Sequence, residues 1–193
     1  MEQRAVAEPI SEELVIAACQ EGDRDAFRQL FETYKDKVFS IAIYSLGGDE
    51  AVASDVSQQV FLKLMTTIGQ FRGDSAFTTW LYRLVVNACA DEQRKRRRFL
   101  SFGDWTPVNK PEDKRSQEHR YAKLELADSV KGAIQELSPK LRMPILLKYV
   151  EGMSYDEIAT VLDCSKGTVA SRLNRGHQSL AKKLGHLRDQ LVD

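Results

Sequence analysis

Apolar residues recur along this chain mainly at intervals of three and four, the spacing that places them on one side of an α-helix. The clearest run follows Asp23, a residue type that favours helix N-caps, and ends at Gly47 and Gly48. Strand-like alternation is nearly absent from the sequence. The pattern therefore predicts an all-α fold. The apolar stripe of this run consists of Phe27, Leu30, Phe31, Tyr34, Val38 and Ile41.

Three further helices are predicted in the first half of the chain. One runs from about Ser11 to Glu21, and a second follows a possible cap at Asp49. The third is capped by Ser75, after a loop over residues 69–73, and runs out into five consecutive cations, residues 94–98. The apolar stripes of the last two helices hold Val56, Val60, Phe61, Leu64, Met65 and Ile68, and then Phe77, Trp80, Leu81, Leu84, Val85 and Ala88.

The periodic pattern fails between Phe99 and about Lys123, where glycine, prolines and mixed charges occur together. This composition predicts a flexible linker over residues 99–123 between two small helical domains, residues 11–98 and 124–187. The linker aromatics either dock on another surface or cover the end of the preceding domain, and the sequence leaves both readings open. These aromatics are Phe99, Phe102 and Trp105.

Helical spacing resumes at Leu124 and continues to Gly152. The pair Ser138–Pro139 suits a helix start, because proline is favoured at the first helical position. Pro144 lies inside the following segment and is expected to kink or delay that helix.

Residues 153–175 carry the strongest local pattern. Ser154 and Glu157 form a potential capping box, which is followed by a short apolar helix, a tight break at residues 163–165 and a second short helix without acids. This is the pattern of a helix-turn-helix whose second helix fits the major groove of DNA. The simpler alternative is a helical hairpin with a solvated face. The outward positions of the second helix are Lys166, Thr168, Ser171, Arg172, Asn174 and Arg175.

A second candidate region for nucleic acid extends from Phe71 to Arg98, where aromatic residues alternate with arginines. Such a mixture suits unstacked bases and their phosphates. On the residues alone, Phe77, Trp80 and Leu81 are better explained as core, and the cationic stretch is equally well explained as a solvated helix end.

Composition narrows the choice of function. The chain has 28 basic and 28 acidic residues, and this neutral total argues against a protein that coats DNA without specificity. Its three cysteines are far apart and form no CxxC pair, so we expect reduced thiols and neither a metal site nor a cofactor. No apolar stretch reaches the roughly 20 residues of a membrane span, and the N-terminus does not look like a secretory signal. We therefore expect a cytoplasmic protein without membrane insertion.

With both regions in place, the chain resembles the extracytoplasmic-function sigma factors of bacteria from about Ser11 to Leu184. The resemblance depends on the order and spacing of several short motifs. These are Gly22-Asp23 with Ala26-Phe27, Asp55 with Gln58 and Val60-Phe61, residues 71–77, residues 79–83, Glu151-Gly152, Ser154-Tyr155, residues 157–159, residues 167–169 and Ser171-Arg172.

The resemblance implies a transcription initiation factor that is not an enzyme and has no catalytic residue. Its partners would be core RNA polymerase, promoter DNA (melted at the −10 element and duplex at the −35 element) and an anti-sigma factor. The core polymerase contacts would be Asp55, Gln58, Gln59, Phe61, Leu62 and Met65. The −10 contacts would be Phe71, Arg72, Trp80, Arg83, Asn87, Arg94, Arg96 and Arg97, with a flipped base trapped near Asn87. The −35 contacts would be the six outward positions of the second helix.

Three positions depart from the usual family pattern. Gln59 replaces an acid, Ala170 replaces a basic residue that faces DNA in many members, and Pro144 replaces a helical residue. We expect a weaker polymerase contact at Gln59 and altered promoter reading at Ala170.

Three other classes of protein remain for comparison. A stand-alone DNA-binding regulator would need a sensor domain, which the helical first half does not provide. A nucleic-acid enzyme would need clustered carboxylates or histidines, and the adjacent Asp91 and Glu92 point to different helix faces. A helical adaptor would leave the acid-free helix unexplained.

Overall fold

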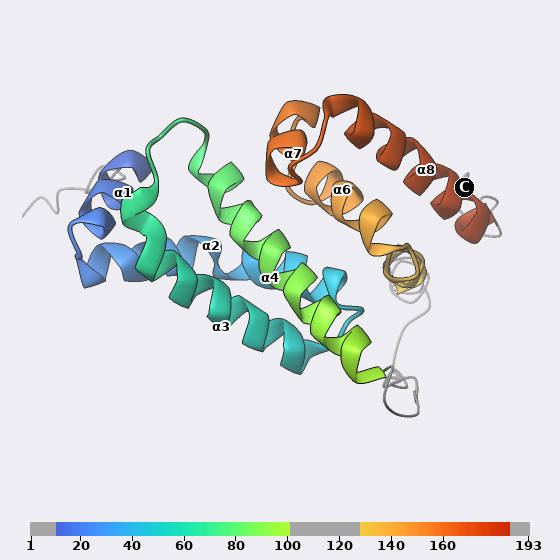
Figure 1. Ribbon diagram of the computed structural model, residues 1–193, viewed down its shortest axis with the longest axis horizontal. Coiled ribbons are helices and arrows are strands. Elements are labelled where there is room, and N and C mark those ends of the chain that lie inside the picture. Colours follow the sequence, from blue (N-terminus) through green and yellow to red (C-terminus); the bar gives the residue numbers. More distant parts are fainter. Residues whose placement is uncertain (1–10, 101–127, 186–193) are drawn as a thin grey trace, which may run out of the picture.

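The computed structural model describes residues 11–100 and 128–185, and these residues form helices and no strand (Figure 1). The all-α prediction is confirmed. The first domain contains α1 (Glu12–Gln20), α2 (Arg24–Ser45), α3 (Glu50–Thr67), the 3-10 helix η1 (Ile68–Gln70) and α4 (Phe77–Leu100). The second contains helical residues 128–135, α6 (Pro139–Tyr149), α7 (Tyr155–Val161) and α8 (Lys166–Leu184). The predicted roles of Phe102, Trp105, Leu124 and Leu126, and of the Phe99 side chain, lie outside the described residues.

The predicted caps of the first domain are largely confirmed. The Asp23 carboxylate accepts hydrogen bonds from the amides of Asp25 and Ala26 at 2.8 and 3.1 Å, and Asp49 accepts from the Val52 amide at 3.1 Å. The prediction of Ser75 as the cap of α4 is wrong by one residue. The first carbonyl that accepts a helical hydrogen bond belongs to Ala76, so the extended loop reaches one position further.

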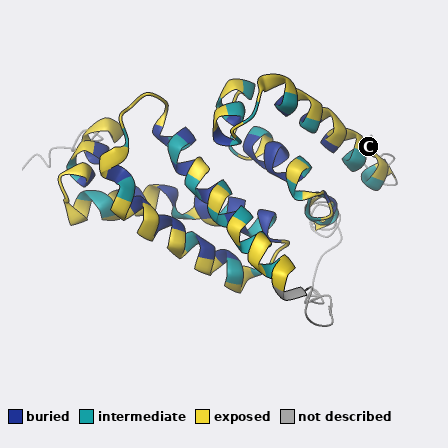
Figure 2. Ribbon diagram, in the orientation of Figure 1, coloured by how far each residue is buried: buried dark blue, intermediate teal, exposed yellow. Residues whose placement is uncertain are grey.

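The core of the first domain lies where α2, α3 and α4 meet, and buried residues follow one side of each helix (Figure 2). Two residues assigned to the apolar stripes are exposed instead, Phe31 at 37% and Met65 at 56%. The buried contact between α2 and α3 is therefore narrower than the apolar stripe that the sequence predicts for either helix.

In the second domain α6, α7 and α8 pack around Ile145, Leu147, Ile158, Val169 and Leu173. α6 begins five residues before Pro144 and continues past it, so the expectation of a delayed helix is wrong. A proline at this position removes the hydrogen bond to the carbonyl four residues earlier and crowds that carbonyl, yet the helix continues. Buried neighbours in the sequence, Met143 and Ile145, hold the turn in place.

The two domains contact each other directly. α7 packs against α4, and α6 packs against the C-terminal part of α2. At the α2–α3 turn Gly48 has a φ of 87°, and an added Cβ there would lie 2.6 Å from the side-chain nitrogen of Gln135. The left-handed φ favours glycine at this position, and any Cβ would displace the flexible end of the Gln135 side chain.

All three cysteines are free thiols. Cys19 and Cys89 are buried, Cys164 is half-buried, and burial raises the pKa of Cys89 to about 11. Across residues 11–100 and 128–185, no three histidine, cysteine or acidic side chains gather in a way that could hold a metal ion. Within the same ranges, no helix has the length and apolar character needed to cross a bilayer.

Candidate nucleic-acid interface

The helix-turn-helix is built as its local sequence predicts. The Glu157 amide donates to the Ser154 hydroxyl at 3.2 Å, and the Ser154 amide donates to the Glu157 carboxylate at 2.7 Å, which completes the capping box. Hydrogen bonds from Ser154 hold the pKa of Glu157 below its usual value. Asp163 adopts a φ of 47° in the turn between the helices. The capping box therefore fixes the start of α7, and the turn at Asp163 fixes the direction in which the chain continues into α8.

α8 presents most of its predicted polar positions to solvent. Val169 and Leu173 are buried beneath the helix, whereas Ser171, Asn174 and Arg175 are exposed. Spacings of three and four place these three side chains on one face. The helix has 19 residues and is not short as predicted, because residues 176–184 continue it along α6.

Two of the cations predicted on α8 have partners within the protein. Lys166 donates to the carboxylate of Asp156 at 2.7 Å and so connects α8 to α7. Arg172 is half-buried, with a guanidinium nitrogen 3.8 Å from the sulfur of Cys164. Neither side chain is as free as its helical position suggests, and Thr168 is also half-buried.

On α4, Arg83, Asn87 and Arg94 are exposed at intervals of four and seven residues, which places them on one face. Trp80 continues this face by one turn and is half-buried. The structure thus brings four of the predicted −10 residues into a line, whereas Phe77 and Leu81 belong to the core, at 3% and 0% exposure.

The loop before α4 is held by aromatic packing and by α1. The ring of Phe71 lies 5.5 Å from that of Phe77 and 5.7 Å from that of Trp80, centroid to centroid. The side-chain amide of Gln20 donates to the carbonyls of Ile68 and Phe71 at 3.1 and 2.8 Å. Phe71 is therefore preorganised and half-buried, with the exposed Arg72 beside it.

The cationic stretch at the end of α4 is not uniform. Arg96 donates to Asp49 at 2.7 Å and lies 3.4 Å from Glu92, and this contact lowers the pKa of Asp49. Arg94 pairs with Asp91. Arg97 is exposed, and no ion pair of this side chain occurs within the described parts of the chain.

α3 carries the predicted polymerase residues on its outer face. Asp55, Gln58, Gln59, Leu62 and Met65 are exposed at helical spacing, and Leu62 is 54% exposed. Phe61 differs from the other five, since it is only 6% exposed and its ring packs against Phe31.

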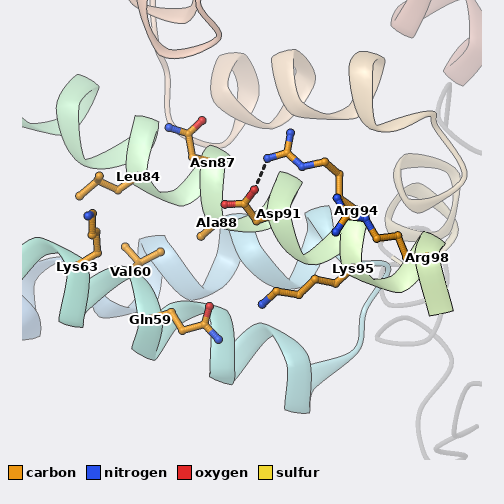
Figure 3. Close-up of a pocket in the computed structure, with 10 residues that line it drawn as sticks. All are labelled: Gln59, Val60, Lys63, Leu84, Asn87, Ala88, Asp91, Arg94, Lys95 and Arg98. Atoms are coloured by element: carbon orange, nitrogen blue, oxygen red, sulfur yellow. Dashed lines mark hydrogen bonds and ion pairs between the residues drawn. The ribbon is translucent and has the colours of Figure 1, made fainter.

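A groove of about 510 Å³ between α3 and α4 brings residues of two predicted sites together (Figure 3). α3 contributes Gln59 to its wall, and α4 contributes Asn87 and Arg94. The sequence reading did not select Lys63, which also lines this groove, although it follows Gln59 by four residues and so shares its helix face.

Sequence reading also overlooked residues that act between distant elements. Gln20 and Arg142 both donate hydrogen bonds to residues more than 45 positions away. Their own neighbourhoods carry no periodic or motif pattern that could have identified them.

Comparison with known proteins gives consistent matches for both domains. Residues 30–99 match the family described as Sigma-70 region 2, and residues 127–180 match Sigma-70, region 4. The chain is 34% identical over 178 residues to the RNA polymerase sigma-H factor of Pseudomonas aeruginosa, which covers 88% of this chain and 92% of that protein. It is also 34% identical over 194 residues to the ECF RNA polymerase sigma-E factor of Escherichia coli K12, covering 93% and 97%.

Two solved structures are similar over both domains. CnrH, in complex with the cytosolic domain of CnrY, has a TM-score of 0.66 and 27% identity over 91% of this chain and 97% of that chain. The sigma factor RpoE from Bartonella quintana, in complex with the anti-sigma factor NepR, has a TM-score of 0.69 and 27% identity over 82% and 96%.

Proposed function

Because this chain belongs to the extracytoplasmic-function family of RNA polymerase sigma factors, we propose that three of its helix faces bind three parts of the initiation complex. Members of this family are transcription initiation factors and not enzymes. In this proposal the outer face of α3 binds core RNA polymerase, α4 and the loop before it bind the melted −10 element, and α8 binds the −35 element as duplex.

The exposed face of α8 carries this proposal. Ser171, Asn174 and Arg175 share that face, and two buried residues fix the helix beneath them. Arginine and asparagine form paired hydrogen bonds with guanine and adenine edges in the major groove. The acidic Asp156 pairs with Lys166, which weakens its repulsion of phosphates near the start of the helix.

For the −10 element, Asn87 at the rim of the α3–α4 groove is the proposed contact for a flipped base. The fixed aromatic cluster of Phe71 and Trp80 supplies a stacking surface near the start of α4. Arg83 and Arg97, both exposed, are the proposed phosphate contacts. Trapping a flipped base must offset an unpairing cost of a few kcal/mol.

The domain limits and further partners are also proposals. We assign residues 11–98 to sigma region 2, 99–123 to a linker and 124–187 to region 4, limits that lie close to the matched segments. The complex of the Bartonella sigma factor with NepR supports control of this chain by an anti-sigma factor. A cytoplasmic location follows from the same function, because promoters are there.

The decisive test is transcription with purified core RNA polymerase on promoters selected from a random DNA library by the reconstituted holoenzyme. We expect promoter-specific transcripts that depend on this protein. Arg175→Ala should weaken initiation at −35-dependent promoters without weakening polymerase binding. Lys182→Ala removes an exposed cation from the same helix outside the proposed contacts, and should leave initiation unchanged.

Asn87→Ala should slow strand opening, and a template that is already unpaired at the −10 element should restore its activity. Absence of any promoter-specific transcript with the unaltered protein at low salt would overturn the proposed function. Equal loss of polymerase binding and initiation in Arg175→Ala would show that the recognition helix has been placed wrongly.

A further inference from the structure

The two proposed DNA-binding surfaces lie too close together to be used at the same time. Arg97 on α4 and Arg172 on α8 line one cavity of about 320 Å³ between the domains. The −10 and −35 elements are, by their names, about 25 base pairs apart, or about 85 Å along a duplex. The described arrangement therefore cannot place both surfaces on one promoter.

Opening is compatible with the length of the chain between the domains. Residues 101–127 supply 27 residues, whose fully extended length reaches about 90 Å. A bound promoter thus requires the domains to separate, and the chain is long enough for this.

A single buried arginine connects the domains in the closed arrangement. Arg142 on α6 is 9% exposed, and one of its terminal nitrogens donates to the carbonyls of Tyr44 and Ser45 at 3.2 and 2.6 Å. These carbonyls belong to the last turn of α2, where the helix dipole favours a positive charge. The other terminal nitrogen donates to the carbonyls of Gln135 and Leu137 within its own domain.

A second contact strengthens the same interface. The hydroxyl of Tyr82 on α4, a residue 2% exposed, donates to the carboxylate of Glu151 at the start of the helix-turn-helix. Within the first domain, the side-chain amide of Gln93 also donates to the Ser45 carbonyl at 3.1 Å, and so helps to hold the acceptor that Arg142 uses.

The hydrogen bonds of Arg142 are incomplete in the closed arrangement, which favours opening. The remaining guanidinium nitrogen of Arg142, Nε, is buried and has no hydrogen-bond partner within the described residues. A buried donor without a partner destabilises the closed state relative to an open one in which water reaches it. The carbonyls that Arg142 caps lie at a helix end, so solvent can replace the arginine without unwinding α2.

We propose that Arg142, assisted by Tyr82, is the latch of a closed resting state that must open before the protein can serve a promoter. This proposal rests on the proposed function for its consequence, since only a sigma factor must span both elements. The latch itself is a property of the isolated chain. The closed state and its effect on the use of a promoter are therefore measured separately.

The first measurement is small-angle X-ray scattering of the full chain. The unaltered protein should have a radius of gyration near the roughly 16 Å of a compact chain of this length. Arg142→Gln and Tyr82→Phe should raise it toward about 25 Å, the value for two small domains on a 27-residue tether. Tyr34→Phe is the matched control, because it removes another buried hydroxyl whose acceptor, Glu12, lies in the same domain.

The second measurement is the concentration of factor that gives half-maximal promoter-specific transcription. The apparent affinity is reduced in proportion to the fraction of molecules that are open. If a tenth of the unaltered protein is open at rest, a fully opened variant should reach half-maximal transcription at a concentration up to about tenfold lower. We expect this gain for Arg142→Gln, a smaller one for Tyr82→Phe and none for Tyr34→Phe.

Two results would overturn the latch: an extended unaltered protein, and folded variants that stay compact. Extended variants with unchanged half-saturation would overturn the claim that opening must precede use of a promoter. If Arg142→Gln loses helicity because its own domain needs the capped carbonyls, Tyr82→Phe alone decides. Absence of transcription with the unaltered protein would instead reject the proposed function, and scattering would still test the latch.

Discussion

The ring of Phe31 on α2 packs edge-on against the ring of Phe61 on α3, with centroids 4.7 Å apart and planes inclined by 67°. Phe61 is buried, whereas Phe31 covers it and remains 37% exposed. Next to Phe61 along α3, Leu62 and Met65 are more than half exposed. The three exposed side chains form an apolar face on two helices that the fold itself does not cover.

We predict that Leu62→Ala and Met65→Ala weaken binding of core RNA polymerase without lowering the stability of the protein. Interface residues that matter cost more than about 1 kcal/mol on truncation to alanine, or roughly fivefold in affinity. Both side chains are more than half exposed in the free protein, so their truncation should have little effect on folding. Titration of labelled protein with core polymerase, together with urea unfolding, measures the two effects.

Leu14→Ala is the matched control, because Leu14 is a leucine with 63% exposure on α1. It should change neither affinity nor stability. If it weakens polymerase binding as much as Leu62→Ala does, the proposed face on α3 is not the contact. Leu64→Ala removes a fully buried side chain from the same helix and should instead cost about 2–5 kcal/mol of stability.

The parts of this protein that sequence alone predicted are those determined locally. The capping box at Ser154 and Glu157 needs only residues three apart, and the aspartate caps at 23 and 49 need only the following turn. The helices, the helix-turn-helix and the exposed face of α8 follow from such local patterns.

What the sequence could not give depends on packing between distant segments. Arg96 was assigned to DNA because it stands in a cationic stretch, but α3 brings Asp49 to it from 47 positions away. Arg142 meets the end of α2 from 97 positions away. Such pairings depend on how helices cross, and periodicity within one helix says nothing about crossing.

The cations of α4 should therefore differ in their effect on DNA. We predict that Arg97→Ala lowers the slope of log affinity against log salt by about 1 for the holoenzyme on promoter DNA, as expected for one lost phosphate contact. Arg96→Ala should change this slope less, because Asp49 already neutralises its charge. Arg96→Ala should instead lower the free energy of unfolding, by no more than about 1 kcal/mol because the pair is partly exposed.

Filter-binding or fluorescence titrations between 50 and 200 mM salt, a range of about fourfold in which such slopes are well resolved, give the comparison. Equal slopes for the two variants would mean that the Arg96–Asp49 pair opens when DNA binds. A slope unchanged by Arg97→Ala would remove that residue from the proposed −10 surface.

The capping box predicts a pH-dependent contribution to the stability of the second domain. Because the pKa of folded Glu157 is lowered, its carboxylate stabilises the fold at neutral pH, and this contribution is lost as the pH falls through the folded value. Glu157→Gln should be less stable than the unaltered protein at pH 7, with the difference shrinking below the ordinary glutamate pKa of about 4.3. Urea unfolding at several pH values measures it.

Ser154→Ala tests the same motif by a different route. Loss of the hydroxyl should cost about 1 kcal/mol at pH 7, since the Glu157 amide loses its acceptor. It should also bring the pKa of Glu157 part of the way back toward its ordinary value, because the Ser154 side chain is the largest cause of the shift while the Ser154 amide, which alanine retains, still lowers this pKa. A Glu157 titration by NMR that is the same in both proteins would contradict this explanation.

The crossing of α6 and α8 depends on the absence of a side chain at Gly176. A Cβ there would lie 3.1 and 3.2 Å from two carbons of Ile145 and 3.7 Å from the carbonyl of Leu141. Ile145 is 3% exposed and has little room to move, so we expect crowding to cost about 1–3 kcal/mol. Alanine is preferred over glycine in a helix interior by about 1 kcal/mol, which offsets only part of that cost. Gly176→Ala should therefore be less stable than the unaltered protein.

Gly167→Ala, whose Cβ would meet only the Ser165 hydroxyl at 3.9 Å, should be slightly more stable because the preference acts there without crowding. Urea unfolding that ranks Gly176→Ala level with Gly167→Ala would show that α8 can shift away from α6, and that the position of α8 is not fixed by this contact.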